Sequence, residues 1–237
     1  MKSFLLFFLA TSLSIACIPG DYGWDCVDAE GSKETRQIDV SDFSGLSASG
    51  SHKVNVVRGS SNALSVEGHG NHLDLLDVKV KNGTLQLGFE KCIKDSDITF
   101  TVTTPELEKV VNSGSGMVFS DDRFSANSMK VTNSGSGRVN LRVDAQDLRV
   151  SNSGSGRIHL EGSGNSMTIN NSGSGRIDMA DYRARTAKVS FSGSGRGEIA
   201  VSDEITGAVS GSGKIRHRGN ARTNVSISGS GGLERIN

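Results

Sequence analysis

Five positively charged residues recur at one position of a repeated motif. The motif is Ser-Gly-Ser-Gly, and in five consecutive copies the next residue is Arg138, Arg157, Arg176, Arg196 or Lys214. Guanidinium groups bind acidic oxygens through paired hydrogen bonds, so a row of them suits an anionic polysaccharide or a membrane surface of lipid head groups. The alternative is a solvated charged face that keeps a β-protein soluble and blocks lateral aggregation.

The elements that position these cations form a tandem array. Seven copies of the motif follow one another at intervals of 18 to 21 residues, and they begin at Ser113, Ser134, Ser153, Ser172, Ser192, Ser210 and Ser228. Such a regular interval is typical of stacked repeats, in which each repeat buries its apolar face against its neighbours. The first copy precedes Met117 and the last precedes Gly232, so the cations belong to the central coils.

Within a repeat, apolar residues alternate with polar ones around the motif. One parity reads Leu148, Val150, Asn152, Gly154, Gly156, Ile158 and Leu160, and the other carries the serines and arginines. In an extended chain one parity faces one side, which predicts an all-β, right-handed parallel β-helix with about 19 residues per coil. The inward asparagines should stack as an amide ladder, and Lys130, Arg149 and Lys188 should form a second outward row before the motif.

The chain before the repeats divides into three segments. Residues 1–16 have Lys2 followed by a short apolar run, which is typical of a signal peptide. Residues 17–37 are polar and rich in turn residues, so we expect a tether. Residues 38–109 contain short β-type runs, including a hairpin at Asn82-Gly83, and should form the N-terminal β region of a domain that spans 38–237, with the repeat coils over 110–237.

The three cysteines suggest an exported protein. The run Leu13-Ser14-Ile15-Ala16-Cys17 resembles a bacterial lipobox, which would make Cys17 the site of lipid attachment; the alternative is cleavage by signal peptidase before Cys17 without lipid. We expect an outer-membrane or periplasmic lipoprotein of the cell envelope, or otherwise a secreted protein. Cys26 and Cys92 then remain as a pair for a disulfide in an oxidising compartment, with two free thiols as the alternative.

The motifs together resemble a known family. The Ser-Gly-Ser-Gly copies, with the upstream segments Phe43 to Ser51 and Val80 to Leu85, are similar to the bacterial head GIN domain, which is labelled a "putative auto-transporter adhesin". The resemblance covers residues 38–237. It implies an all-β, right-handed β-helical fold and a location in the cell envelope. We therefore expect a non-enzymatic binding, adhesion or scaffold module.

Composition and motif content argue against several other functions. The 26 basic and 26 acidic residues cancel, so nothing favours a nucleic-acid partner. The sequence shows no phosphate-binding loop and no set of metal ligands, and we expect no cofactor, no metal and no catalytic residues. The alternative function is a polysaccharide-active β-helix enzyme, a lyase or a hydrolase, which would need carboxylates gathered in one cleft. The sequence leaves the ligand and the oligomeric state undetermined.

Overall fold

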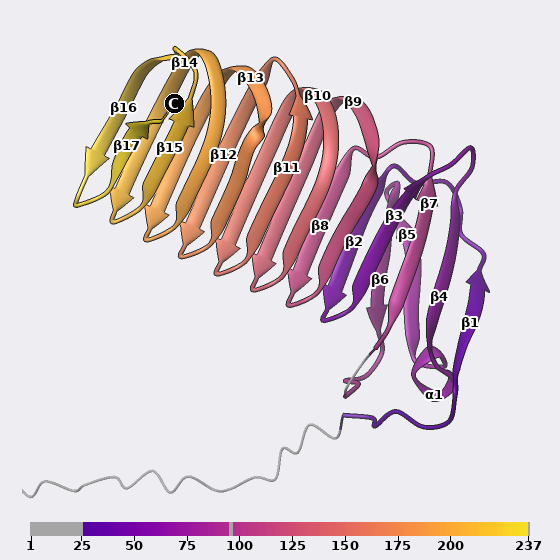
Figure 1. The fold of residues 1–237 in the computed structure, drawn as a ribbon. Helices are drawn as coiled ribbons and strands as arrows, with labels where there is room; N and C mark the ends of the chain where they lie inside the picture. The colour runs from indigo at the N-terminus through magenta and orange to yellow at the C-terminus, as the bar shows by residue number, and fades with distance from the viewer. Residues whose placement is uncertain (1–25, 95–96, 237) are drawn as a thin grey trace, which may run out of the picture.

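The chain folds as a single parallel β-solenoid. The structure is a computed structural model that describes residues 26–94 and 97–236, and Figure 1 shows its strands stacked side by side along one axis. All of its strands join one 17-stranded sheet, wound into about 7 turns of about 19 residues each. The predicted all-β parallel β-helix is therefore confirmed. The predicted signal peptide and Cys17 lie outside the described residues.

Each coil has two walls joined at the Ser-Gly-Ser-Gly bend. The wall before the bend stacks parallel strands in the order β2, β8, β9, β10, β12, β13, β14 and β16, and the wall after it stacks β3, β9, β10, β11, β13, β14, β15 and β17. Four of these strands are long enough to run through both walls. The bounds are β2 Gly45–Gly50, β3 Lys53–Arg58, β8 Lys109–Gly114, β9 Met117–Gly135, β10 Arg138–Gly154, β11 Arg157–Ser163, β12 Ser166–Gly173, β13 Arg176–Gly193, β14 Arg196–Gly211, β15 Lys214–Arg218, β16 Arg222–Ser228 and β17 Gly232–Arg235.

The N-terminal end of the stack is covered by antiparallel strands. The hairpin of β5 and β6 pairs with β2 on one wall, and β7, β4 and β1 extend the other wall from β3. Asn82 and Gly83 both have positive φ at the hairpin turn, as the sequence predicts. The bounds are β1 Lys33–Ile38, β4 Ala63–His69, α1 Gly70–Leu73, β5 Leu76–Lys81, β6 Thr84–Phe89 and β7 Thr99–Thr104.

Two boundaries differ from those expected. The tether expected over residues 17–37 contains most of β1, which pairs with β4 from Lys33 to Ile38. This pairing satisfies backbone groups of β4 that would otherwise form an open edge. Residues 45–58 form a turn of the stack ahead of the repeats, because Ser49-Gly50-Ser51-His52 takes the place of the motif and the Ser115 and Gly116 N–H groups both donate to the Gly50 carbonyl.

The core between the two walls follows the predicted parity. Leu148, Val150, Ile158 and Leu160 are each at most 1% exposed, and the alternate residues face solvent or are half-buried. Equivalent positions pair directly between coils, for example Val150 with Ile169. The burial of one apolar parity in every coil is what holds the stack together.

Candidate functional site: the arginine row

The five predicted cations lie in one line on consecutive strands. Arg138 pairs with Arg157, Arg157 with Arg176, Arg176 with Arg196, and Arg196 with Lys214, and all five are exposed. Neighbouring strands of a sheet are about 4.8 Å apart, so the row presents one cation at each such step along the solenoid axis. We call these five residues the arginine row.

Buried asparagines make the first four bends alike. The Nδ2 of Asn133 donates to the Asn152 Oδ1 at 3.0 Å and to the Gly137 carbonyl at 3.1 Å. Asn112, Asn152 and Asn171 each donate in the same way to the glycine carbonyl four residues on, and Asn112 and Asn152 also donate to the next asparagine. The predicted amide ladder is thus confirmed. Each amide fixes the bend that follows it, which orients Arg138, Arg157 and Arg176 alike. The bends before Arg196 and Lys214 follow the apolar residues Phe191 and Val209 instead.

Both glycines of the motif are required by this geometry. Gly154 has a φ of 104°, and a Cβ there would lie 2.7 Å from the Gly135 carbonyl oxygen of the preceding coil. A Cβ on Gly156 would overlap the Asn133 Nδ2. The first glycine therefore allows the tight turn between coils, and the second leaves room for the neighbouring amide.

A shallow groove lies beside the arginine row. It has a volume of about 530 Å³, and its walls are four arginines of the row and the second serine of each motif, namely Ser136, Ser155, Ser174 and Ser194. Within residues 26–94 and 97–236, no side chain of the row forms an ion pair or a hydrogen bond. The cations and hydroxyls are therefore available for acidic oxygens of a ligand.

The carboxylates next to the row have other partners on neighbouring strands. Two positions further along the strands, His159 pairs with Asp178 and Asp178 with Glu198. Glu198 forms an ion pair with Arg216, and the His159 Nδ1 lies 3.6 Å from the Asp178 Oδ2. These contacts reduce the neutralisation of the arginine row by its own neighbours.

Charge on the other wall is less continuous. Lys130 pairs with Arg149, but the next coils place Thr168 before Lys188. The predicted second row is therefore interrupted.

One cation that sequence reasoning missed is Lys53, which pairs with Met117 beyond the N-terminal end of the arginine row. The signal was present, since Lys53 follows Ser49-Gly50-Ser51-His52 as the arginines follow their motifs.

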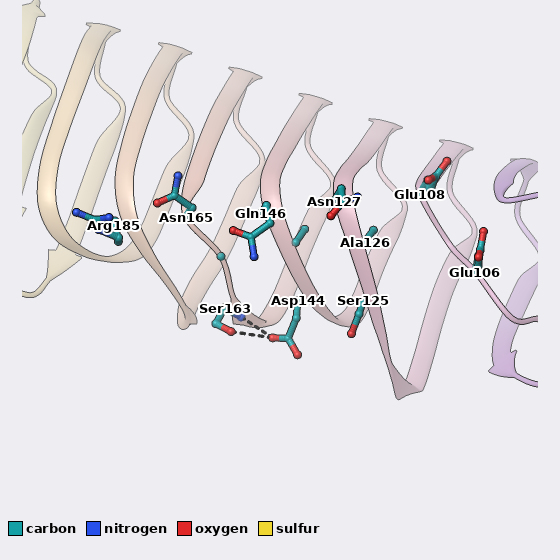
Figure 2. Close-up of a pocket in the computed structure, with 12 residues that line it drawn as sticks. Glu106, Glu108, Ser125, Ala126, Asn127, Asp144, Gln146, Ser163, Asn165 and Arg185 are labelled. Carbon is teal, nitrogen blue, oxygen red and sulfur yellow. Dashed lines mark hydrogen bonds between the residues drawn. The ribbon is translucent and has the colours of Figure 1, made fainter.

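A second groove lies along the opposite bends of the coils. Figure 2 shows the side chains of Asn127, Gln146 and Asn165 on successive coils, and all three residues are exposed. The small residues Ala126, Ala145 and Gly164 line the same groove. The groove has a volume of about 780 Å³ and also contains Glu106, Glu108, Ser125, Asp144, Ser163 and Arg185. Its polar groups are both donors and acceptors, and they suit neutral hydroxyl-bearing ligands as well as charged ones.

The carboxylates of this groove bear on the enzyme alternative. Asp144 forms an ion pair with Arg123 at 3.0 Å and accepts hydrogen bonds from the backbone N–H and hydroxyl of Ser163, both at 2.9 Å. Glu108 accepts a hydrogen bond from the Ser44 hydroxyl at 3.2 Å. Glycoside hydrolysis generally uses an acid and a second carboxylate on either side of the bond to be cleaved. Asp144 and Glu108 thus already have partners, and Glu106 is a third carboxylate in the same groove.

The remaining sequence predictions concern cysteines and metals. The structure joins Cys26 to Cys92 through a disulfide, and the adjacent Val27 forms an isolated bridge with Ile93. No group of three or more His, Cys, Asp or Glu side chains in the described part of the chain is arranged to hold a metal ion. No helix among the described residues is long and apolar enough to cross a membrane.

Comparison with known proteins places this fold and motif in a family. The family model "putative auto-transporter adhesin, head GIN domain" matches residues 42–221. The chain belongs to the head GIN domain family. A search of curated proteins finds no match.

Several solved structures share this fold. A "putative adhesin" from Bacteroides fragilis is 24% identical, with a TM-score of 0.84 over 89% of this chain and 100% of that one. A "putative lipid binding protein" from Parabacteroides distasonis is 25% identical, with a TM-score of 0.72 over 89% and 99% of the two chains. A "putative adhesin" from Parabacteroides merdae is 19% identical, with a TM-score of 0.67 over 90% and 100%.

Proposed function

We propose that this chain is a non-enzymatic adhesion module of the bacterial cell envelope, and that the arginine row binds a linear acidic polysaccharide. The observation that carries the proposal is the register of five exposed cations on consecutive coils, none of which has a side-chain partner among the residues that the structure describes. A straight row of charges along a rigid axis matches a ligand whose own charges repeat along its length. Membership of a family described as adhesins supports the same class of function.

The contacts expected in the complex follow from the groove. Each guanidinium donates to a carboxylate or sulfate of the glycan, and the motif serines donate to or accept from neighbouring hydroxyls. Individual exposed charge contacts are weak, about 0.2–1 kcal/mol each. Binding therefore depends on several coils acting together.

A charge-matched pair of variants tests this proposal. The triple change Arg157→Gln, Arg176→Gln and Arg196→Gln removes three charges from the arginine row. The control triple change at Lys130, Arg149 and Lys188 to Gln removes three exposed charges from the other wall. On an array of acidic glycans, the first triple variant should lose at least tenfold in affinity, and the control should stay close to the unchanged protein. Equal losses for the two variants, or none for the first, would refute the proposal.

Lipid head groups are a second candidate ligand. The observation that favours them is the likeness to the solved protein described as a "putative lipid binding protein". Vesicles that contain anionic lipid, compared with neutral vesicles, distinguish the two ligands in the same binding assay. Retention on anionic vesicles without glycan binding would replace the polysaccharide by a membrane surface as the partner.

We further propose that residues 1–16 direct export and that Cys17 carries a lipid anchor. The support is the apolar run followed by small residues and a cysteine in the sequence. Acyl chains on one cysteine would hold the protein on a membrane, because each buried methylene contributes about 0.8 kcal/mol. Labelled fatty acid should enter the intact protein and not the Cys17→Ser variant. Unlabelled intact protein would instead support export without a lipid.

A further inference from the structure

A second basic site lies where the regular stacking of the coils is interrupted. Strand β13 pairs with β14 at Met179 and Ile199 and next at Arg183 and Ala200, so the three residues between Met179 and Arg183 have no partner in β14. Such bulges re-aim side chains and are frequent next to functional sites. The extra length agrees with the 20-residue interval between Ser172 and Ser192.

Tyr182 makes the bulge specific. Its side chain is fully buried, and its hydroxyl donates to the Ala145 carbonyl at 2.9 Å. Burial raises the pKa of Tyr182 to about 12, so the phenol stays protonated and remains a donor. A Cβ on Gly164 would overlap this hydroxyl. The inward turn of Tyr182 removes a large side chain from the outer surface at this point.

The outer surface is hollow there. The hollow has a volume of about 810 Å³, and small residues on three successive strands line it, among them Gly162, Ala180 and Ala200. Four arginines and two carboxylates lie around it, namely Arg123, Arg183, Arg185, Arg218, Glu161 and Asp181. It is therefore a cavity with a net basic rim, separate from the groove beside the arginine row.

Two of these arginines are free to act on a ligand. Arg123 pairs with Asp144 and Arg185 with Asp203, whereas the side chains of Arg183 and Arg218 make no ion pair or hydrogen bond with the part of the chain that the structure describes. Arg183 pairs across the strands with Ala200, and Ala200 with Arg218. Their Cα atoms are thus two strand spacings apart, about 10 Å, with only a methyl group between them.

Only one of the two carboxylates on the rim is left to oppose this pair. Glu161 accepts from Arg142 at 3.2 Å and lies 3.3 Å from the His159 Nε2, and the His159 hydrogen bond lowers the pKa of Glu161. Its charge is therefore already compensated by neighbours outside the hollow. Asp181, which lies within the bulge, is the one acid on the rim whose side chain makes no ion pair or hydrogen bond with the described residues.

We propose that Arg183 and Arg218 bind a phosphomonoester group over Ala200. A guanidinium offers two parallel N–H donors to two oxygens of one phosphate, and a phosphomonoester has three terminal oxygens and nearly two negative charges. Two arginines on either side of a small residue can therefore hold one such group between them. The rest of the ligand, a sugar or the glycerol of a lipid head group, rests on the small residues that line the hollow. This site is independent of the proposed glycan binding by the arginine row.

Calorimetric titration of the full chain at low salt tests the site with three probes. These are glucose 6-phosphate, glycerol 3-phosphate and unmodified glucose. A phosphorylated probe should bind at one site per chain, and glucose should not bind. Preference for glucose 6-phosphate identifies a phosphorylated sugar as the ligand class, and preference for glycerol 3-phosphate identifies a glycerol phosphate, such as the head group of phosphatidate.

Three variants separate the hollow from general anion binding. Arg183→Gln with Arg218→Gln should weaken binding at least tenfold. Ala200→Leu, which fills the space without changing charge, should weaken it similarly while leaving the circular dichroism spectrum unchanged. The control Arg157→Gln with Arg176→Gln removes the same charge from the arginine row and should leave binding intact. Binding that falls equally in the control, that survives Ala200→Leu, or that is absent from the unchanged protein overturns the proposal.

Discussion

Replacing Asn152 by Ala would interrupt the buried amide ladder at its centre. The Asn152 amide donates to the Asn171 Oδ1 at 3.0 Å and to the Gly156 carbonyl at 3.2 Å, and it accepts from the Asn133 Nδ2 at 3.0 Å. Each such bond contributes about 0.5–1.5 kcal/mol net to the free energy of unfolding. Leaving the buried Asn171 oxygen unsatisfied adds about 1–3 kcal/mol. We expect a total destabilisation of about 3–5 kcal/mol.

Two control variants make this prediction specific. Asn171→Ala, at the end of the ladder, loses one bond to Asn152 and one to Gly175, so it should be destabilised by about 2 kcal/mol. Ser153→Ala, at an exposed position of the same bend, should change stability by less than about 0.5 kcal/mol. The order of the three values is therefore expected to be Asn152, then Asn171, then Ser153.

Guanidinium chloride unfolding followed by far-ultraviolet circular dichroism measures these differences through the midpoint and slope of the transition. Amide hydrogen exchange then shows whether the loss is confined to the coils around residue 152 or spreads along the stack. If Asn152→Ala is no less stable than Ser153→Ala, the ladder does not hold the bends. If Asn171→Ala loses as much as Asn152→Ala, the continuity of the ladder is not what matters.

Two further predictions follow from buried groups. Gly156→Ala should prevent normal folding of its coil, because the new methyl group would overlap the Asn133 amide; the readouts are a lower melting temperature and lost exchange protection. The control Gly232→Ala should be neutral, because no atom lies within 4 Å of the added Cβ. Equal effects of the two variants would contradict the packing argument. His52 is buried against aromatic rings, and desolvation lowers its pKa, so the unfolded chain binds more protons and stability should fall as pH drops below about 6.5. In His52→Phe the fall in unfolding midpoint between pH 7 and pH 5 should be smaller; an unchanged pH dependence would show that His52 stays uncharged in both states or charged in both.

The regular part of the fold is predictable from the sequence because it repeats. One parity of apolar residues, seen in several coils, predicts both the buried face and the line of Arg138, Arg157 and Arg176. The asparagine ladder follows from the same parity, since a buried amide needs a partner and the next coil supplies one. Spacing alone therefore places most of the arginine row.

The irregular parts were missed because each occurs once. The pairing of β1 with β4 depends on an edge that exists only after the strands assemble, and nothing in the polar segment before Ile38 indicates it. The bulge beside Met179 appears in the sequence only as one additional residue, which could lie anywhere in the interval. That Tyr182 turns inward depends on space above Gly164, which is a property of the neighbouring coil.

The most direct test of the account uses acidic oligosaccharides of increasing length, with binding measured by calorimetry at fixed salt. If five aligned cations form one site, affinity should rise with each added charged sugar until the oligosaccharide covers the row from Arg138 to Lys214, and then level off. Replacing the central Arg176 by Gln should reduce the gain for long oligosaccharides and leave the shortest ones nearly unaffected. Affinity that is independent of length, or that is unchanged in Arg176→Gln at every length, would contradict a continuous binding row.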